Sequence, residues 1–348
     1  MNRSLTLLCA LAVLLVLAAC GSDSDDQADT SGGDTATATA DEITVYSGRE
    51  KELVEPLLDR FTEETGVKLN VRYGDSAELA ATLIEEGDAS PADVYFGQDA
   101  GALGALQKDG RLEDLPSDLL RTVDGKFRSR EGSWVGTSGR VRVIAYDSRE
   151  VSESDLPQSV IGLSRAQWAD KVGYAPTNGS FQAFVTAMRK VEGEGVAKQW
   201  LEGLVENDAR TYDGNTAIRD AIADGEIQLG LINHYYVVQA REEEGDDYPV
   251  KLYFPPGGDV GSLINVAGAG IVTGSEEAAT AEQFIRFLLN KESQTYFADE
   301  TKEYPLIDGV EPDSSLPALS EIQQPGVDLS DLDDLEGTTK LIERTGAL

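Results

Sequence analysis

Apolar positions along the chain follow two spacings in turn, and the alternation predicts strands that lead into helices. Residues 43–46 form a short strand-like run, and residues 50–64 follow it with apolar side chains at helical spacing up to Gly66. A strand at 68–73, a helix at 77–86, a strand at 93–96 and a helix at 100–108 are expected next. This order predicts an α/β domain with a largely parallel sheet.

The second part of the chain repeats the alternation without an internal sequence repeat. The pattern predicts strands at 140–146, 228–233 and 266–272, and helices near 181–191, 195–205, 216–223, from about 236, at 278–289 and near 338–344, the last one after a turn-rich segment at 311–334. Two α/β sets of similar size indicate a bilobed protein with a cleft between its lobes. Ligands of open α/β sheets bind beyond the carboxyl ends of strands, so functional residues are expected just after strands.

The N-terminus has the pattern of a secretory signal. Arg3 precedes an apolar stretch at 5–19, which is too short for an ordinary membrane-spanning helix. Small residues lead up to Cys20, and this arrangement resembles a bacterial lipobox. We therefore expect residues 1–19 to be a signal peptide and Cys20 to carry lipid, so that the extracytoplasmic protein is anchored to the cell membrane without spanning it. An ordinary secretory signal with a chance cysteine is the alternative.

Amino-acid composition limits the domain organisation and the kinds of ligand and partner that the protein can have. Residues 21–41 contain no large apolar residue, so residues 20–41 are expected to be the lipidated cysteine and a disordered tether. The rest of the chain exceeds the usual size of one core, which favours two domains. The net charge of −34 argues against nucleic acid as a partner. Solubility is its simplest explanation, and the charge would also help to attract a cationic ligand. Cys9 lies in the signal and Cys20 is expected to be lipidated, so no thiol remains for a metal site or a nucleophile.

The segment Asn233-His234-Tyr235-Tyr236 is the first candidate for chemistry. It follows a predicted strand, and two adjacent tyrosines at a strand-to-helix junction can present their oxygens to one point. Phenol has a pKa near 10, so only a strong Lewis acid such as Fe³⁺ removes both protons at neutral pH. Adjacent tyrosines also cap cores or stack on sugar rings, and the motif alone leaves these alternatives open.

Two loops are candidates for anion binding. Gln98-Asp99-Ala100-Gly101 and Thr177-Asn178-Gly179-Ser180 each open a predicted helix. Backbone N–H groups at a helix N-terminus are suited to anions. Simple helix capping by Asp99, Asn178 or Ser180 is the alternative.

Enzyme signatures are missing from the sequence. His234 is the only histidine, no G-x-S-x-G motif surrounds a serine, and no Walker loop or dinucleotide-binding glycine motif follows a strand. With 63 acidic residues, no carboxylate pair stands out as catalytic. We expect a binding protein rather than an enzyme, with a lipid-tethered hydrolase or an adhesive lipoprotein as alternatives from other classes.

Six blocks in order resemble one family. They are Ile43-Thr44-Val45-Tyr46-Ser47-Gly48, Pro91-Ala92-Asp93-Val94-Tyr95-Phe96, Ser138-Gly139-Arg140-Val141-Arg142-Val143, Val172-Gly173-Tyr174, Leu231-Ile232-Asn233-His234-Tyr235-Tyr236 and Glu303-Tyr304-Pro305-Leu306. Together they resemble the bacterial ferric-ion-binding proteins, the extracellular solute-binding proteins of iron(III) ABC importers. The resemblance implies the periplasmic-binding-protein fold, two α/β lobes joined by two hinge strands: an N-terminal lobe of residues 42–141 plus 267–316 and a C-terminal lobe of residues 142–266 plus 317–348.

The resemblance also implies a site. Tyr235 and Tyr236 stand where the family has its pair of iron ligands. Where the best-known branch has a histidine and a glutamate, this chain has Glu50 and Gln98, which makes Glu50 a candidate third ligand and Gln98 a residue behind the ligands. The extra tyrosines of another branch are replaced by Lys51 and Phe181. A synergistic anion, carbonate or phosphate, is then needed to complete the shell of Fe³⁺. The family's anion-contact positions are here Asp99, Asn178, Gly179, Ser180, Asn215 and Asn233, with Arg49 and Arg140 as nearby positive charges.

The function that the resemblance implies is capture of ferric iron by a monomer and its delivery to the permease subunits of an ABC importer. The main alternative is the same fold with an organic ligand such as thiamine, a polyamine, a phosphonate or an organophosphate, because a fold does not determine a ligand.

Overall fold

The structure is a computed structural model that describes residues 40–348. The predictions of a signal peptide at 1–19, of a lipidated Cys20 and of most of the tether lie outside these residues. Between residues 40 and 348, no helix combines the length and the apolar character that crossing a membrane requires.

The first group of elements forms a parallel sheet with helices around it. Strand β1 (Glu42–Ser47) lies between β2 (Lys68–Tyr73) and β3 (Val94–Gly97) and is parallel to both. The connections are α1 (Lys51–Thr65), α2 (Ser76–Glu86) and α3 (Ala100–Lys108), which starts directly after β3. Helix α1 buries Val54, Leu57, Leu58 and Phe61 and ends at Gly66, whose φ of 76° suits glycine. This apolar face is the one that the sequence pattern predicts.

The second group of elements carries the other side of the site. Strands β5 (Val172–Tyr174), β6 (Arg210–Thr211) and β7 (Leu229–Asn233) pair in parallel, with β5 in the middle. Helices α5 (Gly179–Val191), α6 (Glu194–Glu206), α7 (Asn215–Ala223) and α8 (Tyr235–Glu244) connect or follow them. The helices α5, α7 and α8 therefore all begin within a few residues of a strand's carboxyl end.

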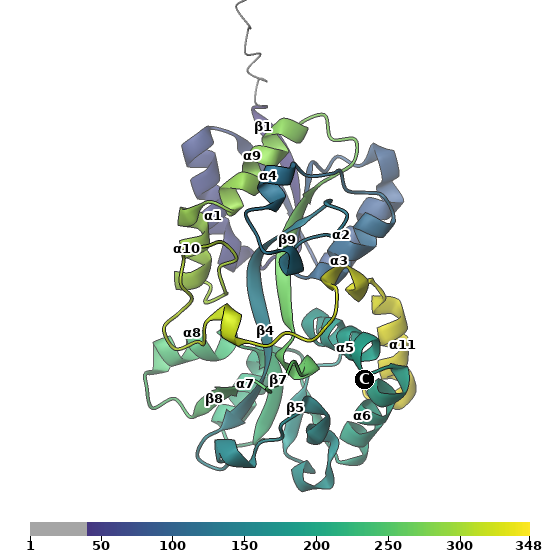
Figure 1. Ribbon diagram of the computed structural model, residues 1–348, viewed down its shortest axis with the longest axis vertical. Helices are drawn as coiled ribbons and strands as arrows, with labels where there is room; N and C mark the ends of the chain where they lie inside the picture. Colours follow the sequence, from purple (N-terminus) through teal and green to yellow (C-terminus); the bar gives the residue numbers. More distant parts are fainter. Residues whose placement is uncertain (1–39) are drawn as a thin grey trace, which may run out of the picture. The chain divides into compact units, whose positions relative to one another are not determined.

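Two long strands link the two groups. Strand β4 (Val135–Asp147) pairs with β9 (Ile264–Ile271) over Val135–Val141, and with β7 and β8 (Val250–Tyr253) over its remaining residues. Figure 1 shows β4 and β9 side by side, running through the middle of the molecule between an upper and a lower group of helices. The nine strands of residues 40–348 form one sheet through β4. The two hinge strands expected of a bilobed binding protein are therefore β4 and β9.

The pairing pattern confirms the parallel arrangement predicted for the first three strands. The sheet as a whole is mixed, because β9 runs antiparallel to β3 and β4 runs antiparallel to β7, β8 and β9. Strands that pass from one group of helices to the other reverse direction relative to the strands they join. The parallel arrangement holds within each group, where helices connect neighbouring strands.

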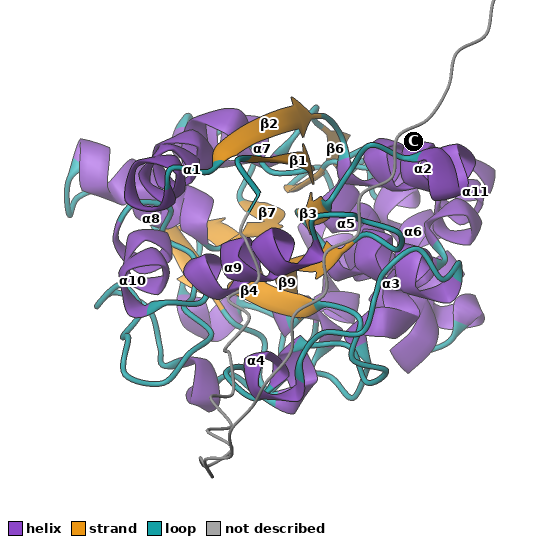
Figure 2. Cartoon of the chain, turned by 90° about the horizontal axis from the view of Figure 1, so that it is seen from above, coloured by secondary structure: helices purple, strands orange, loops and turns teal. Residues whose placement is uncertain are grey.

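The predicted helices and strands are present, with ends shifted by a few residues. Strands β5, β6 and β8, the short helix α4 (Ser117–Leu120) and helix α10 (Lys291–Asp299), which follows α9 (Ala278–Leu288), were not predicted. Figure 2 shows helices on both sides of the strands, which accounts for the extensive burial of the strand residues. The residue boundaries of the two lobes stay a prediction.

The end of the chain contacts both groups of helices. The short turn at Leu329–Asp333 packs on α3, and α11 (Leu335–Thr345) packs against α5 and α6. Lys108 of α3 forms an ion pair with Asp333, 2.7 Å between Nζ and Oδ2. We call residues 328–334 the C-terminal strap.

Candidate metal centre

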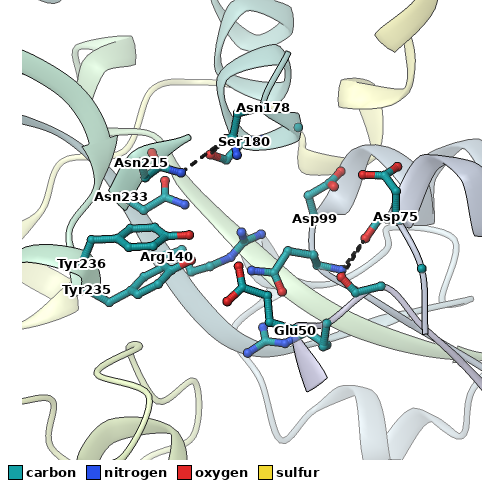
Figure 3. Close-up of a pocket in the computed structure, with 16 residues that line it drawn as sticks. Glu50, Asp75, Asp99, Arg140, Asn178, Ser180, Asn215, Asn233, Tyr235 and Tyr236 are labelled. Atoms are coloured by element: carbon teal, nitrogen blue, oxygen red, sulfur yellow. Dashed lines mark hydrogen bonds between the residues drawn. The ribbon is translucent and has the colours of Figure 1, made fainter. Parts of the chain in front are cut away.

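A cavity of about 260 Å³ lies where the carboxyl ends of strands from the two groups meet. Every residue predicted for the iron and anion sites lines it, including Gln98 (Figure 3). The complete lining is Gly48, Arg49, Glu50, Gly74, Asp75, Ser76, Gln98, Asp99, Arg140, Asn178, Gly179, Ser180, Asn215, Asn233, Tyr235 and Tyr236. Sequence reasoning missed the segment 74–76, although it follows β2 and opens α2 in the same way as the loops that were identified.

The two tyrosines share one environment at the start of α8. Their rings stack with centroids 4.3 Å apart and an angle of 28° between the planes. Figure 3 shows both phenol oxygens pointing into the same part of the cavity. Desolvation by burial raises the pKa of both phenols, that of Tyr235 well above its usual value, and in Tyr236 the charge of Glu50 adds to the effect. The phenols therefore keep their protons at neutral pH unless a strong Lewis acid replaces them.

His234 lies behind the tyrosines and does not line the cavity. Its Nδ1 accepts a hydrogen bond from the backbone N–H of Val141 at 3.1 Å, so its Nε2 carries the proton and donates to the carbonyl oxygen of Lys302 at 2.9 Å. Burial lowers the pKa of His234 to about 4, and the imidazole is neutral at physiological pH. The only histidine of the chain is thus a structural link between strand β4 and the start of α8.

The carboxylates around the cavity differ in whether they are already hydrogen-bonded to the protein. Asp99 caps α3 by accepting from the N–H groups of Gly101 and Ala102 at 2.9 and 3.2 Å, and Asp75 caps α2 in the same way. Burial raises the pKa of Asp99. Glu50 precedes α1 but makes no capping hydrogen bond with its side chain. Of the carboxylates around the cavity, Glu50 is therefore the one best able to turn toward a cation.

Arg49 lines the cavity, but its positive charge is already paired with a carboxylate. Its Nη2 lies 2.6 Å from Oε2 of Glu303, and both side chains are fully buried. Burial acts to raise the pKa of Glu303, but the charge and hydrogen bonds of Arg49 outweigh it and hold that pKa below its usual value. Sequence reasoning missed Glu303 as the partner, because the two residues are far apart in the chain.

Arg140 is the cation that faces the cavity with donors to spare. Its Nε lies 3.9 Å from Oε1 of Glu303, and its Nη2 has no hydrogen-bond partner among residues 40–348. Figure 3 shows its guanidinium beside the tyrosine rings and across from Glu50. A buried guanidinium with a free N–H group is suited to an oxyanion.

Amide and hydroxyl groups form the wall next to Tyr236. Asn178 caps α5, with its Oδ1 accepting from the N–H and the hydroxyl of Ser180 at 3.2 and 2.6 Å. Asn215 and Asn233 are buried, at the start of α7 and the end of β7. Among residues 40–348, no three His, Cys, Asp or Glu side chains converge into a metal site.

Comparisons with known proteins point to one family. Residues 57–324 match the family model described as bacterial extracellular solute-binding protein. The major ferric iron-binding protein of Neisseria meningitidis serogroup A is 36% identical over 314 residues, 89% of this chain and 95% of that protein.

Two solved structures share the fold. Iron-bound HitA from Pseudomonas aeruginosa superposes with a TM-score of 0.82 at 30% identity, over 88% of this chain and 99% of that one. A Trichodesmium protein in complex with iron and citrate gives a TM-score of 0.77 at 30% identity, again over 88% and 99% of the two chains. The extent of these matches, together with two groups of α/β elements around one cleft, establishes that the chain belongs to the family of bacterial extracellular solute-binding proteins.

Proposed function

We propose that this chain binds ferric iron in the cleft through Tyr235 and Tyr236 and delivers it to an ABC importer. The observation that carries the proposal is the stacked tyrosine pair, whose phenol oxygens point into one cavity. The ferric iron-binding protein of Neisseria meningitidis and the iron-bound HitA and Trichodesmium structures support the choice of metal.

The donor set favours a hard trivalent cation. Two buried phenols give up their protons only to a strong Lewis acid, and oxygen donors suit Fe³⁺. Glu50 is the candidate for a third oxygen. Among residues 40–348, no thiol or imidazole lines the cavity, so a softer metal would find few ligands in this part of the chain.

A synergistic anion, carbonate or phosphate, completes the site in this proposal. Arg140 supplies positive charge, and the wall made of Asn178, Gly179, Ser180, Asn215 and Asn233 supplies N–H and O–H groups. Arg49 contributes less because Glu303 neutralises it. Asp99 does not repel the anion strongly, because its carboxylate is bonded to the first N–H groups of α3.

The protein performs no reaction on the iron in this account. Its role is capture, closure of the lobes about β4 and β9, and docking to permease subunits, the partners that membership of the solute-binding family implies. Lipid on Cys20 would keep the monomer at the extracytoplasmic face of the membrane, close to its permease.

Spectroscopy separates ferric iron from an organic ligand. Addition of ferric nitrilotriacetate to the purified protein should give a visible phenolate-to-iron charge-transfer band that saturates at one iron per chain. Thiamine, a polyamine or an organophosphate should neither give colour nor raise the thermal unfolding temperature. A colourless protein that one of these organic compounds stabilises would instead support the alternative ligand class.

A further inference from the structure

We call the wall made of Asn178, Gly179, Ser180, Asn215 and Asn233 the amide wall. A third arginine, Arg142, contacts this wall but does not line the cavity. Arg142 follows Arg140 by two residues on β4, so the two side chains leave the strand on the same face. It is paired in register with Asn233 of β7, at the place where β4 changes partner from β9 to β7. Only 2% of its surface is exposed.

Arg142 is a buried cation without a carboxylate partner among the described residues. Its guanidinium lies near the rings of Phe181 and Phe184, 5.7 and 5.6 Å from their centroids. Its Nε and Nη2 have no hydrogen-bond partner within residues 40–348. Burial lowers the pKa of Arg142 to about 9, with the nearby phenols of Tyr236 and Tyr235 acting in the opposite direction, and this leaves the group charged at neutral pH.

The remaining nitrogen, Nη1, contacts three residues of the wall. It donates to Oγ of Ser180 at 3.1 Å, to Oδ1 of Asn215 at 3.3 Å and to Oδ1 of Asn233 at 3.5 Å. A guanidinium has donors only, so it selects the oxygen end of each amide. The NH₂ groups of Asn215 and Asn233 are then free to serve as donors elsewhere.

The contact with Ser180 has a further consequence. Because the hydroxyl oxygen accepts from Arg142, its own hydrogen goes to Oδ1 of Asn178 at 2.6 Å. The same oxygen of Asn178 accepts from Nδ2 of Asn215 at 3.4 Å. The guanidinium of Arg142 thus determines which groups of the wall donate hydrogen bonds and which accept them.

We propose that Arg142 is the positioning residue of the anion half of the site: it holds the donors of the wall toward the cavity and supplies positive charge from behind them. The inference rests on the proposed function, because it assumes a metal-bound anion beside Tyr235 and Tyr236. A buried cation without a carboxylate partner favours an anion in front of the wall over a neutral ligand.

The test measures how much an anion strengthens iron binding. Ferric nitrilotriacetate is titrated into the full-length lipoprotein in detergent, in buffer free of phosphate and bicarbonate and then with each anion added. The charge-transfer band reports binding. The ratio of the two affinities is the anion enhancement.

Three variants are compared with the parent. R142M removes the charge of Arg142 while keeping much of its volume, and R142K keeps the charge but not the planar guanidinium. R149M is the control for the loss of an exposed arginine just beyond β4.

R142M should retain the coloured band but lose about tenfold or more of the anion enhancement, the loss expected when a charge-assisted hydrogen bond is removed. R142K should fall between R142M and the parent, and R149M should match the parent. Should R142M not fold, the R142K result decides alone: an enhancement equal to the parent's overturns the inference.

Three results would overturn the inference while leaving iron binding intact. They are a parent protein that colours without any anion enhancement, an R142M variant with the parental enhancement, and an R142M variant that weakens both affinities equally. A parent protein that gives no colour at all is a different failure, that of the proposed function itself.

Discussion

At the scale of single residues, burial within the fold determines the protonation states of the side chains at the site. Burial keeps the phenols of Tyr235 and Tyr236 protonated without a metal, and it keeps His234 neutral. The phenols lie at the cavity, whereas the imidazole is turned into the protein between β4 and Lys302. The same segment therefore supplies both candidate ligands and the anchor that holds them.

Removing either phenol oxygen should abolish most of the iron affinity. We expect Tyr235→Phe and Tyr236→Phe each to weaken binding by at least about a hundredfold and to remove much of the colour, since each loses a charged ligand of the metal. Gln98→Ala is the control at the cavity wall and should change affinity much less. Competition with citrate, followed by absorbance, measures all three. Parental affinity in both tyrosine variants would refute the ligand assignment.

His234 should titrate far below an ordinary histidine. Its folded pKa of about 4 lies below the ordinary histidine value of 6.5, so the unfolded chain takes up a proton first as the pH falls. The stability that depends on the neutral imidazole is complete above pH 6.5 and is lost as the pH falls toward 4. Because His234 is the only histidine, one imidazole signal in an NMR titration of the iron-free protein reports this pKa directly. A midpoint near 6.5 would show that the imidazole is not held as described.

At the scale of elements, close packing joins the C-terminal strap to α3. A Cβ built on Gly101 would lie 2.6 Å from the carbonyl oxygen of Leu332, and one on Gly104 would overlap the carbonyl oxygen of Ser330. The helix can approach the strap only because these positions carry no side chain. Since α3 starts at the cavity with its cap Asp99, the strap also supports one wall of the site.

Gly104→Ala should therefore destabilise the iron-free protein by about 2 kcal/mol, although alanine is the better helix former. Gly195→Ala in α6 is the matched control, because a Cβ there meets no atom within 4 Å. The control should be neutral or stabilising by less than about 1 kcal/mol. Urea unfolding of both variants measures the difference. Equal stability of G104A and the parent would mean that the strap does not pack closely in solution.

Local patterns account for most elements but not for those with polar buried faces. Helix α1 was predictable because its apolar residues recur on one side. Helix α10 was not, because it buries Ser293 and Gln294, and the amide of Gln294 is satisfied by the carbonyl oxygens of Thr137 and Leu288. The contact with Thr137 depends on the distant strand β4, which a reading of the nine residues of α10 does not contain.

The site residues also divide into those that local sequence reveals and those that depend on distant contacts. Residues that follow a strand or open a helix were found from sequence, together with the family resemblance, except for the segment 74–76 between β2 and α2. Glu303 and Arg142 were not, because their roles come from contacts with Arg49 and with the amide wall across the fold. A signal for Arg142 was present in the alternation of arginines at 140 and 142, which places two cations on one face of a buried strand.

At the scale of the whole molecule, iron binding should depend steeply on pH. The phenols start protonated and the metal needs phenolates, so binding releases about two protons from the tyrosines. Each unit fall in pH should then lower the apparent affinity by about a hundredfold, with further loss from any proton on the anion. Affinity measured at several pH values, with the chelator's own titration subtracted, gives the slope. A flat profile would rule out phenolate ligation.

The central claim is that one ferric ion is bound by both neighbouring tyrosines in the cleft. Diffraction from crystals of the iron-loaded protein, with data collected at the iron absorption edge, tests it most directly. The account predicts one strong anomalous peak within bonding distance of the Oη atoms of both Tyr235 and Tyr236, with an oxyanion between the peak and the wall that holds Asn215 and Asn233. A peak on the acidic surface alone, or one bonded to neither tyrosine, would contradict it.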